Sequence, residues 1–128
     1  MAKSFTLSKE ERLKSRKAIA ELFDKGRKIP MSPFLAYYLF RDVSAAKPVR
    51  MGVGVSGRNF RKAVDRNRIK RLTREAFRLQ KPGLQEILGK KASSLDLFLI
   101  YTGRELPVFE EVFSSVGRII QKLNVAAE

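Results

Sequence analysis

The residues best placed to do chemistry form a run of cations in the middle of the chain, with no nucleophilic thiol or imidazole beside them. Positions 58–81 hold ten Lys or Arg and only two acids, Asp65 and Glu75. The 128-residue chain has a formal net charge of +14 and contains no Cys and no His. A thiolate nucleophile, a Ser-His-Asp triad and Cys- or His-ligated zinc are therefore excluded. Such an excess of positive charge predicts a polyanionic partner. Nucleic acid is the best candidate, and a membrane surface is the second.

The spacing of these residues predicts a helix over about 60–79 with one cationic face. At about 100° per residue, four apolar side chains gather on one side of the helix, which predicts its core face. These are Ile69, Leu72, Ala76 and Leu79. The opposite side carries an i, i+4 row, Arg66, Lys70, Arg74 and Arg78, with Asn67 and Arg71 beside it and Arg68 on the flank near Glu75. Like charges at this spacing repel by roughly 0.2–0.5 kcal/mol per pair, so we interpret the face as a polyanion-binding surface rather than a solvated one.

Asn67 places an uncharged amide among these cations. Its amide offers both a donor and an acceptor, so it could contact a sugar hydroxyl or a base edge, or hold a metal-bound water. An exposed Asn without a role is the alternative.

The rest of the pattern predicts an α+β sandwich with helices on one face of a sheet. The expected elements are a helix at 15–25 with Ser15 as its N-cap and Gly26 as the C′ residue that stops it, strands at 34–41, 49–56 and 95–101, the helix at 60–79, and a last helix with Pro107 at its first position. In the last helix an apolar stripe is expected to face the core: Phe109, Val112, Phe113, Val116, Ile119, Ile120 and Leu123. Residues 83–94 are expected to connect without regular structure beyond a short turn at 84–88, and one more short strand is left open. We expect a single domain over 1–128.

The strand at 49–56 alternates between a β-branched face and a small one. Its small face carries Gly52, Gly54 and Ser56, which would let a neighbouring backbone or a ligand approach closely. No apolar run reaches the length of a membrane span, and the first residues lack the apolar core of a signal peptide. We therefore expect a cytoplasmic protein that neither spans nor binds a membrane.

Segment 66–78, RNRIKRLTREAFR, resembles the signature of the bacterial ribonuclease P protein component. That signature is Arg-Asn-x-x-Lys-Arg followed by Arg-Glu-x-Phe, and the resemblance extends over about 12–123. It implies a ribosomal-protein-like sandwich with a left-handed βαβ crossover. It also implies two partners, a catalytic RNA and precursor tRNA, whose 5′ leader the complex removes. The RNA subunit, with the Mg²⁺ that it mainly holds, would do the chemistry, so the protein would supply no catalytic residue, no metal site and no small-molecule cofactor site.

The resemblance also implies which residues contact each RNA. The residues expected to bind the RNA subunit are Arg58, Lys62, Arg66, Asn67, Arg68, Lys70, Arg71 and Arg74. Those expected to bind the leader, in a cleft between the sheet and the first helix, are Phe23, Tyr37, Ser56, Lys62 and Arg66. For Phe23 and Tyr37, ordinary core packing is the alternative. Two positions depart from the family pattern: Gly57-Arg58 stands where many members have Lys-Lys, and Ile19 where many have Phe.

Three other functions remain open at this point. A structural RNA-binding protein would have the same charge and fold. A metal nuclease would have to use Asp65, Glu75 and Asp96, although the first two lie about 280° apart around the helix. A DNA-binding helix-turn-helix protein is disfavoured by the predicted strands.

Overall fold

The structure is a computed structural model that describes residues 11–42 and 48–127. Within these residues the elements are α1 (Arg16–Lys25), β1 (Arg27–Met31), β2 (Phe34–Arg41), β3 (Val49–Val55), α2 (Ala63–Gln80), α3 (Pro82–Lys90), β4 (Ser94–Tyr101) and α4 (Phe109–Ala127). They form a mixed four-stranded sheet packed with helices, which confirms the predicted α+β class.

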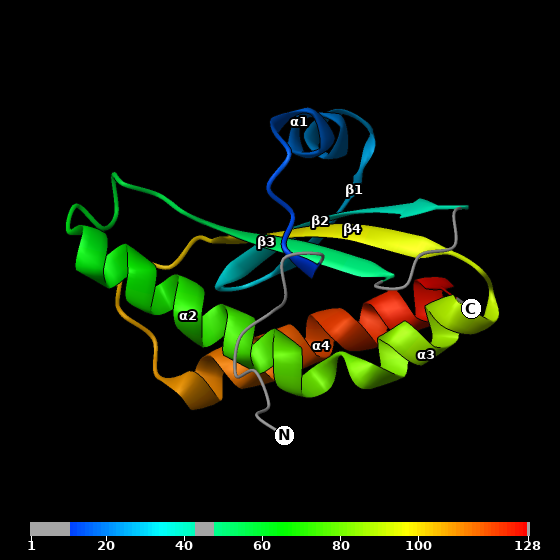
Figure 1. The fold of residues 1–128 in the computed structure, drawn as a ribbon. Helices are drawn as coiled ribbons and strands as arrows, with labels where there is room; N and C mark the ends of the chain where they lie inside the picture. Colours follow the sequence, from blue (N-terminus) through cyan, green and yellow to red (C-terminus); the bar gives the residue numbers. More distant parts are fainter. Residues whose placement is uncertain (1–10, 43–47, 128) are drawn as a thin grey trace, which may run out of the picture.

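The strands follow the order β1-β2-β4-β3. Strand β4 pairs antiparallel with β2 and parallel with β3, so the strand predicted to be covered on both faces is central. The connection from β3 to β4 runs through α2 and α3. It is left-handed, as Figure 1 shows with β3 nearer the viewer than β4 and both helices below the sheet.

The helices lie on both faces of the sheet, so the expectation that they share one face is wrong for α1. Helices α2, α3 and α4 cover one face, and α1 lies across the other (Figure 1). The main core lies between the sheet and the three helices and includes Met51, Leu97, Leu99, Phe77, Ile119 and Leu123. On the other face α1 packs mainly against β2 and β4 and leaves part of the sheet uncovered.

Helix α1 has the predicted bounds, but Gly26 ends it for a different reason. Ser15 accepts a hydrogen bond from the backbone N–H of Ala18, as an N-cap should. Gly26 is extended rather than left-handed, and a Cβ there would lie 3.0 Å from the carbonyl oxygen of Tyr38. A glycine is needed because α1 turns directly into the sheet.

Two elements are present where the residue pattern is weak. Helix α3 occupies part of the expected connection at 83–94, with Pro82 in its first turn and Leu84 and Leu88 buried. Strand β1 is an additional short strand, for which the sequence analysis makes no firm prediction. It is an edge strand, so it tolerates Pro30 and needs to bury only Ile29.

Helix α2 is rotated about its axis from the predicted orientation. Thr73 and Phe77 are buried, whereas Leu79 is 48% exposed. The buried Thr73 hydroxyl has a hydrogen-bond partner, because it donates to the carbonyl oxygen of Ile69 at 2.8 Å.

Helix α4 buries most of the predicted stripe, with two differences. It begins at Phe109 rather than at Pro107, and Glu111 accepts a hydrogen bond from the N–H of Val108 at its start. Phe113 was predicted to lie in the core but is 37% exposed. No helix of the described ranges is long and apolar enough to cross a membrane.

Candidate nucleic-acid interface

The outer face of α2 presents cations that the core positions hold in place. Ile69, Ala76 and Phe77 anchor the helix in the core. On the outer side Asn67, Arg68 and Arg71 are exposed, and three residues of the predicted row, Arg66, Lys70 and Arg74, are half-buried at its margin. The structure thus brings six of the eight residues predicted to bind an RNA subunit onto one helix. Arg58 and Lys62, both exposed, lie in the loop that leads into it.

Arg66 has a structural role in addition to its charge. Its Nη1 donates to the carbonyl oxygens of Phe60 and Arg61 at 2.7 and 2.9 Å. These bonds tie the β3–α2 loop to the first turns of α2 and so fix where Arg58 and Lys62 lie. A guanidinium has five N–H donors, so Arg66 can still bind an anion.

Glu75 pairs with Arg78. The sequence pattern predicts Arg68 as its neighbour instead. Arg78 donates to both carboxylate oxygens at 2.8 Å, and these bonds hold the pKa of Glu75 below its usual value. This pairing removes one cation from the predicted row and leaves Arg68 exposed to a partner.

Within residues 11–42 and 48–127, Arg12 and Arg74 bring two positive charges together without a counter-ion. Residues 11–13 run along the edge of β3, where the Leu13 N–H donates to the Met51 carbonyl oxygen at 2.9 Å. The Arg12 Nε is buried and has no hydrogen-bond partner within the described structure. Burial lowers the pKa of Arg74, and repulsion from Arg12 lowers it further. A phosphate placed against the pair would offset the repulsion between the two guanidinium groups.

Three aromatic rings form a patch on the face of the sheet beside α1. Phe23 lies edge-on to Tyr37 and to Phe98, with ring centroids 4.8 and 5.3 Å apart. Phe23 is 43% exposed, and the other two rings are half-buried. The Lys28 ammonium lies 5.5 Å from the centroid of the Tyr37 ring, within cation–π range. We call Phe23, Tyr37 and Phe98 the aromatic patch.

Phe98 fills much of the space that the small face of β3 was expected to leave open. A Cβ at Gly52 would lie 2.8 Å from its ring, and one at Gly54 would lie 2.9 Å from it. The approaching group is therefore a side chain of the same molecule. Phe98 was missing from the predicted site because its strand is apolar on both faces and so does not mark one side chain as special. Only the strand pairing of β4 with β2 and β3 places Phe98 beside Tyr37 and Gly52.

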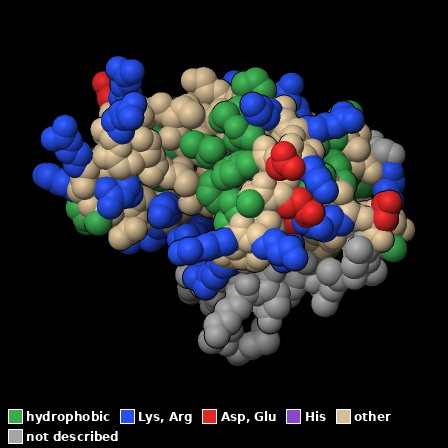
Figure 2. Space-filling model, turned by 90° about the horizontal axis from the view of Figure 1, so that it is seen from above, with side chains coloured by type: hydrophobic (Ala, Val, Ile, Leu, Met, Phe, Trp, Pro, Cys, Tyr) green, Lys and Arg blue, Asp and Glu red, His purple; other side chains and the backbone are tan. Residues whose placement is uncertain are grey.

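The residues predicted to bind a leader fall into two groups. Phe23 and Tyr37 meet in the aromatic patch. Ser56 lies four residues beyond Gly52 along the strand direction, about 13 Å away at the usual rise per residue. It begins the loop that carries Lys62, and its hydroxyl accepts from the Arg58 N–H at 3.1 Å. Figure 2 shows this side: hydrophobic side chains gather in its middle, and Lys and Arg gather at the left end, where α2 begins.

The carboxylates that a metal nuclease would need are not brought together. Asp96 is buried, and its two oxygens accept from Arg50 at 2.9 Å and from Arg41 at 3.0 Å. Arg41 also binds Glu21, which ties α1 to the sheet. No group of three or more His, Cys, Asp or Glu in residues 11–42 and 48–127 could hold a metal ion. The donor set of the described residues therefore does not fit a protein-held Mg²⁺.

Comparison with known proteins gives consistent matches along nearly the whole chain. A family model described as Ribonuclease P matches residues 7–124. A ribonuclease P protein component from Porphyromonas gingivalis is 37% identical over 119 residues, covering 93% of this chain and 84% of the relative. One from Shouchella clausii is 33% identical over 123 residues, covering 94% and 92%.

Solved structures show the same fold. The RNase P protein of Staphylococcus aureus superposes with a TM-score of 0.69 at 21% identity, covering 90% of this chain and 96% of that one. The RNase P protein of Thermotoga maritima gives a TM-score of 0.65 at 22% identity, with the same coverage.

Proposed function

Because the chain belongs to the family of bacterial ribonuclease P protein components, we propose that it binds a catalytic RNA subunit and the 5′ leader of precursor tRNA. In this role it assists the endonucleolytic cut that produces the mature 5′ end. The uncompensated positive charge of α2 and of the segment beside it carries the proposal: Arg68 and Arg71 are exposed, and Arg12 and Arg74 lack a counter-ion in the described structure.

The RNA subunit binds along α2 and the loop before it. Phosphates lie against Arg68, Lys70 and Arg71, and one phosphate bridges Arg12 and Arg74. Such contacts release counter-ions from the RNA, so binding weakens steeply as salt rises. Asn67, set between these cations, contacts a sugar hydroxyl or a base edge.

The precursor leader follows the uncovered face of the sheet. An unpaired base stacks on the aromatic patch, where Phe23 presents the most exposed ring. The backbone continues along β3 to the loop, where the Ser56 hydroxyl and the Lys62 ammonium meet phosphates. Mature tRNA lacks this segment, so the protein favours the precursor.

The RNA subunit performs the hydrolysis. The chain contains no His or Cys, and the carboxylates of Glu75 and Asp96 are held by arginines. Mg²⁺ held by the RNA would supply the chemistry of the cut, an activated water and a counter-charge for the phosphate. The protein's own residues position RNA. Precursor tRNA is in the cytoplasm of bacteria, so a protein with this function works in the cytoplasm.

Equilibrium binding to a bacterial ribonuclease P RNA tests the proposal. Affinity is measured against a structured RNA of equal length, such as a ribosomal RNA fragment, at two salt concentrations. We expect tighter binding to the ribonuclease P RNA at both. Equal affinity for the two RNAs would show a general polyanion binder and reject the proposed function.

A further inference from the structure

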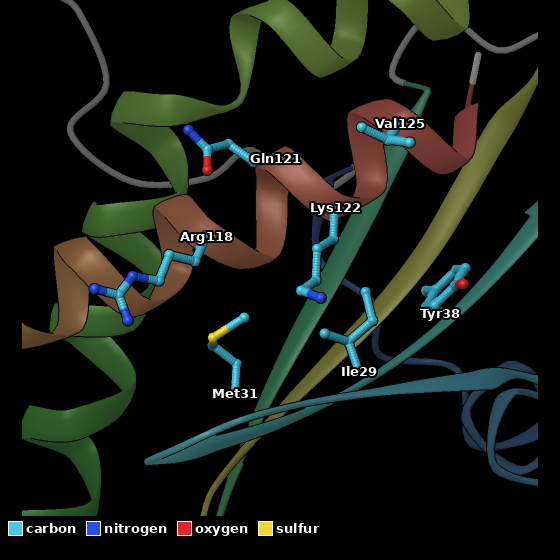
Figure 3. Close-up of a pocket in the computed structure, with 7 residues that line it drawn as sticks. All are labelled: Ile29, Met31, Tyr38, Arg118, Gln121, Lys122 and Val125. Carbon is cyan, nitrogen blue, oxygen red and sulfur yellow. The ribbon is translucent and has the colours of Figure 1, made fainter.

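A groove separates edge strand β1 from α4, at the opposite edge of the sheet from β3. Ile29, Met31 and Tyr38 form its floor, and Val125 closes one end. Arg118, Gln121 and Lys122 of α4 also line it, and the groove encloses about 540 Å³. In Figure 3 the Lys122 side chain extends from α4 toward Ile29, with Met31 and Tyr38 on either side. We call this the edge groove.

The edge groove combines an apolar floor with positive charge and no acid among its lining residues. Arg118 and Lys122 form no ion pair within the described structure, and both are exposed. A second hollow of about 380 Å³ adjoins it, since Tyr38 lines both, and adds Lys25 and Arg27. Four cations therefore line two hollows that share the side chain of Tyr38.

We infer that the edge groove binds an unpaired segment of RNA, with a base against its apolar floor and phosphates at Arg118 and Lys122. The inference rests on the proposed function, because it assumes that the chain works bound to RNA. It adds a second contact, since α2 packs beside β3 and the groove lies beside β1. An RNA that contacts both edges would pass around the protein rather than bind one helix.

Charge favours RNA over the other partners that the edge groove could bind. A second copy of the chain would bring a further net charge of +14 against the four cations. An acidic peptide would suit the charge, but an RNA held on the same molecule is present at high effective concentration. Stacking on Tyr38 adds an attraction that any base can supply.

Site-directed cleavage tests the inference, because the chain has no Cys and accepts a unique label. Val125 lines the groove and is 74% exposed, so V125C carries an iron chelate with little disturbance. The labelled protein is assembled with ribonuclease P RNA and precursor tRNA, and hydroxyl-radical cuts are mapped. E86C, on the exposed side of α3, is the matched control, and N67C reports the α2 contact.

We expect V125C to cut one short RNA segment that N67C does not cut, and E86C to cut far less. Adding the R118Q/K122Q double substitution should abolish the V125C cuts, leave the N67C cuts, and lower the slope of log affinity against log salt by up to about 1.4 units, the value for two contacts to a single strand. The single substitution K90Q should change neither pattern.

Two outcomes would overturn the inference while leaving the proposed function standing. In the first, N67C cuts the RNA but V125C does not, so RNA does not occupy the groove, which is then open to another partner such as an acidic peptide. In the second, V125C cuts persist unchanged in R118Q/K122Q, so the groove is only near the RNA. Absence of cuts from N67C as well would instead reject the proposed function.

Discussion

The ring of Phe98 occupies the space that a side chain at position 52 would need. A Cβ on Gly52 would lie 2.8 Å from the ring, closer than real Cβ contacts come. The same ring lies against Phe23, whose own ring contacts Tyr37. The glycine on β3 therefore sets the position of the aromatic patch, although it lies outside it.

Replacing Gly52 with Ala should move Phe98 and disturb the patch. Overpacking of this kind costs about 1–3 kcal/mol, so the urea midpoint should fall. Precursor binding by the holoenzyme should weaken, whereas RNA-subunit binding should not. Gly57→Ala is the matched control, because a Cβ at Gly57 meets nothing within 4 Å. If Gly52→Ala binds precursor as the wild type does, the position of Phe98 does not matter for the leader.

Removing the Tyr37 ring should reduce selection of the precursor. Tyr37→Ala should weaken precursor binding by roughly 1–3 kcal/mol, the cost of one lost stack, with mature tRNA affinity unchanged. Tyr37→Phe keeps the ring and should behave as the wild type does. Equal weakening for both tRNAs, or a loss visible only in thermal melts, would identify Tyr37 as a core residue.

Lys70→Ala tests the α2 surface through its salt dependence. Loss of one phosphate contact should weaken binding to the RNA subunit and lower the slope of log affinity against log salt by up to about 0.9 unit. Lys90→Ala removes an exposed lysine that pairs only with Glu86 in the described structure, and it should leave the slope unchanged. Identical slopes for Lys70→Ala and the wild type would remove Lys70 from the interface.

Asp65→Asn and Glu75→Gln test whether the protein contributes a catalytic acid or base. At saturating protein and RNA, single-turnover cleavage should stay within about tenfold of the wild type, because neither carboxylate touches the reacting phosphate. A true acid–base group would cost about 10²–10⁴-fold when removed. A loss above about 10³-fold in either variant would assign chemistry to the protein.

Local patterns in the sequence predicted most of the fold. The apolar stripe of α4 and the alternating side chains of β2 and β3 are patterns of residues close together in the sequence, so these elements lie where predicted. The predicted core face of α2 is rotated from the observed one because Thr73 is a polar residue, a type that favours an exposed position. Its hydroxyl donates to the Ile69 carbonyl oxygen within the helix, so Thr73 can be buried. Strand β1 gave little signal because an edge strand buries only Ile29 of its five residues.

The resemblance to a family paired Phe23 with Tyr37, whereas spacing alone predicted site residues only where they are close in sequence. The cations of α2 and its loop were identified from one continuous segment. Phe98 and Arg12 were not, because each joins the site through strand register or through a segment along β3. The approach of Arg12 to Arg74 depends on tertiary packing, which no local spacing reveals.

Reconstituted cleavage tests the central claim most directly. Single-turnover cleavage of a precursor tRNA is measured with ribonuclease P RNA alone, protein alone and the two together, at a Mg²⁺ concentration too low for the RNA alone. The account predicts no cleavage by the protein alone, and cleavage at the mature 5′ end by the complex that rises to a plateau as protein saturates the RNA. Cleavage by the protein alone, or a complex no faster than the RNA, would contradict it.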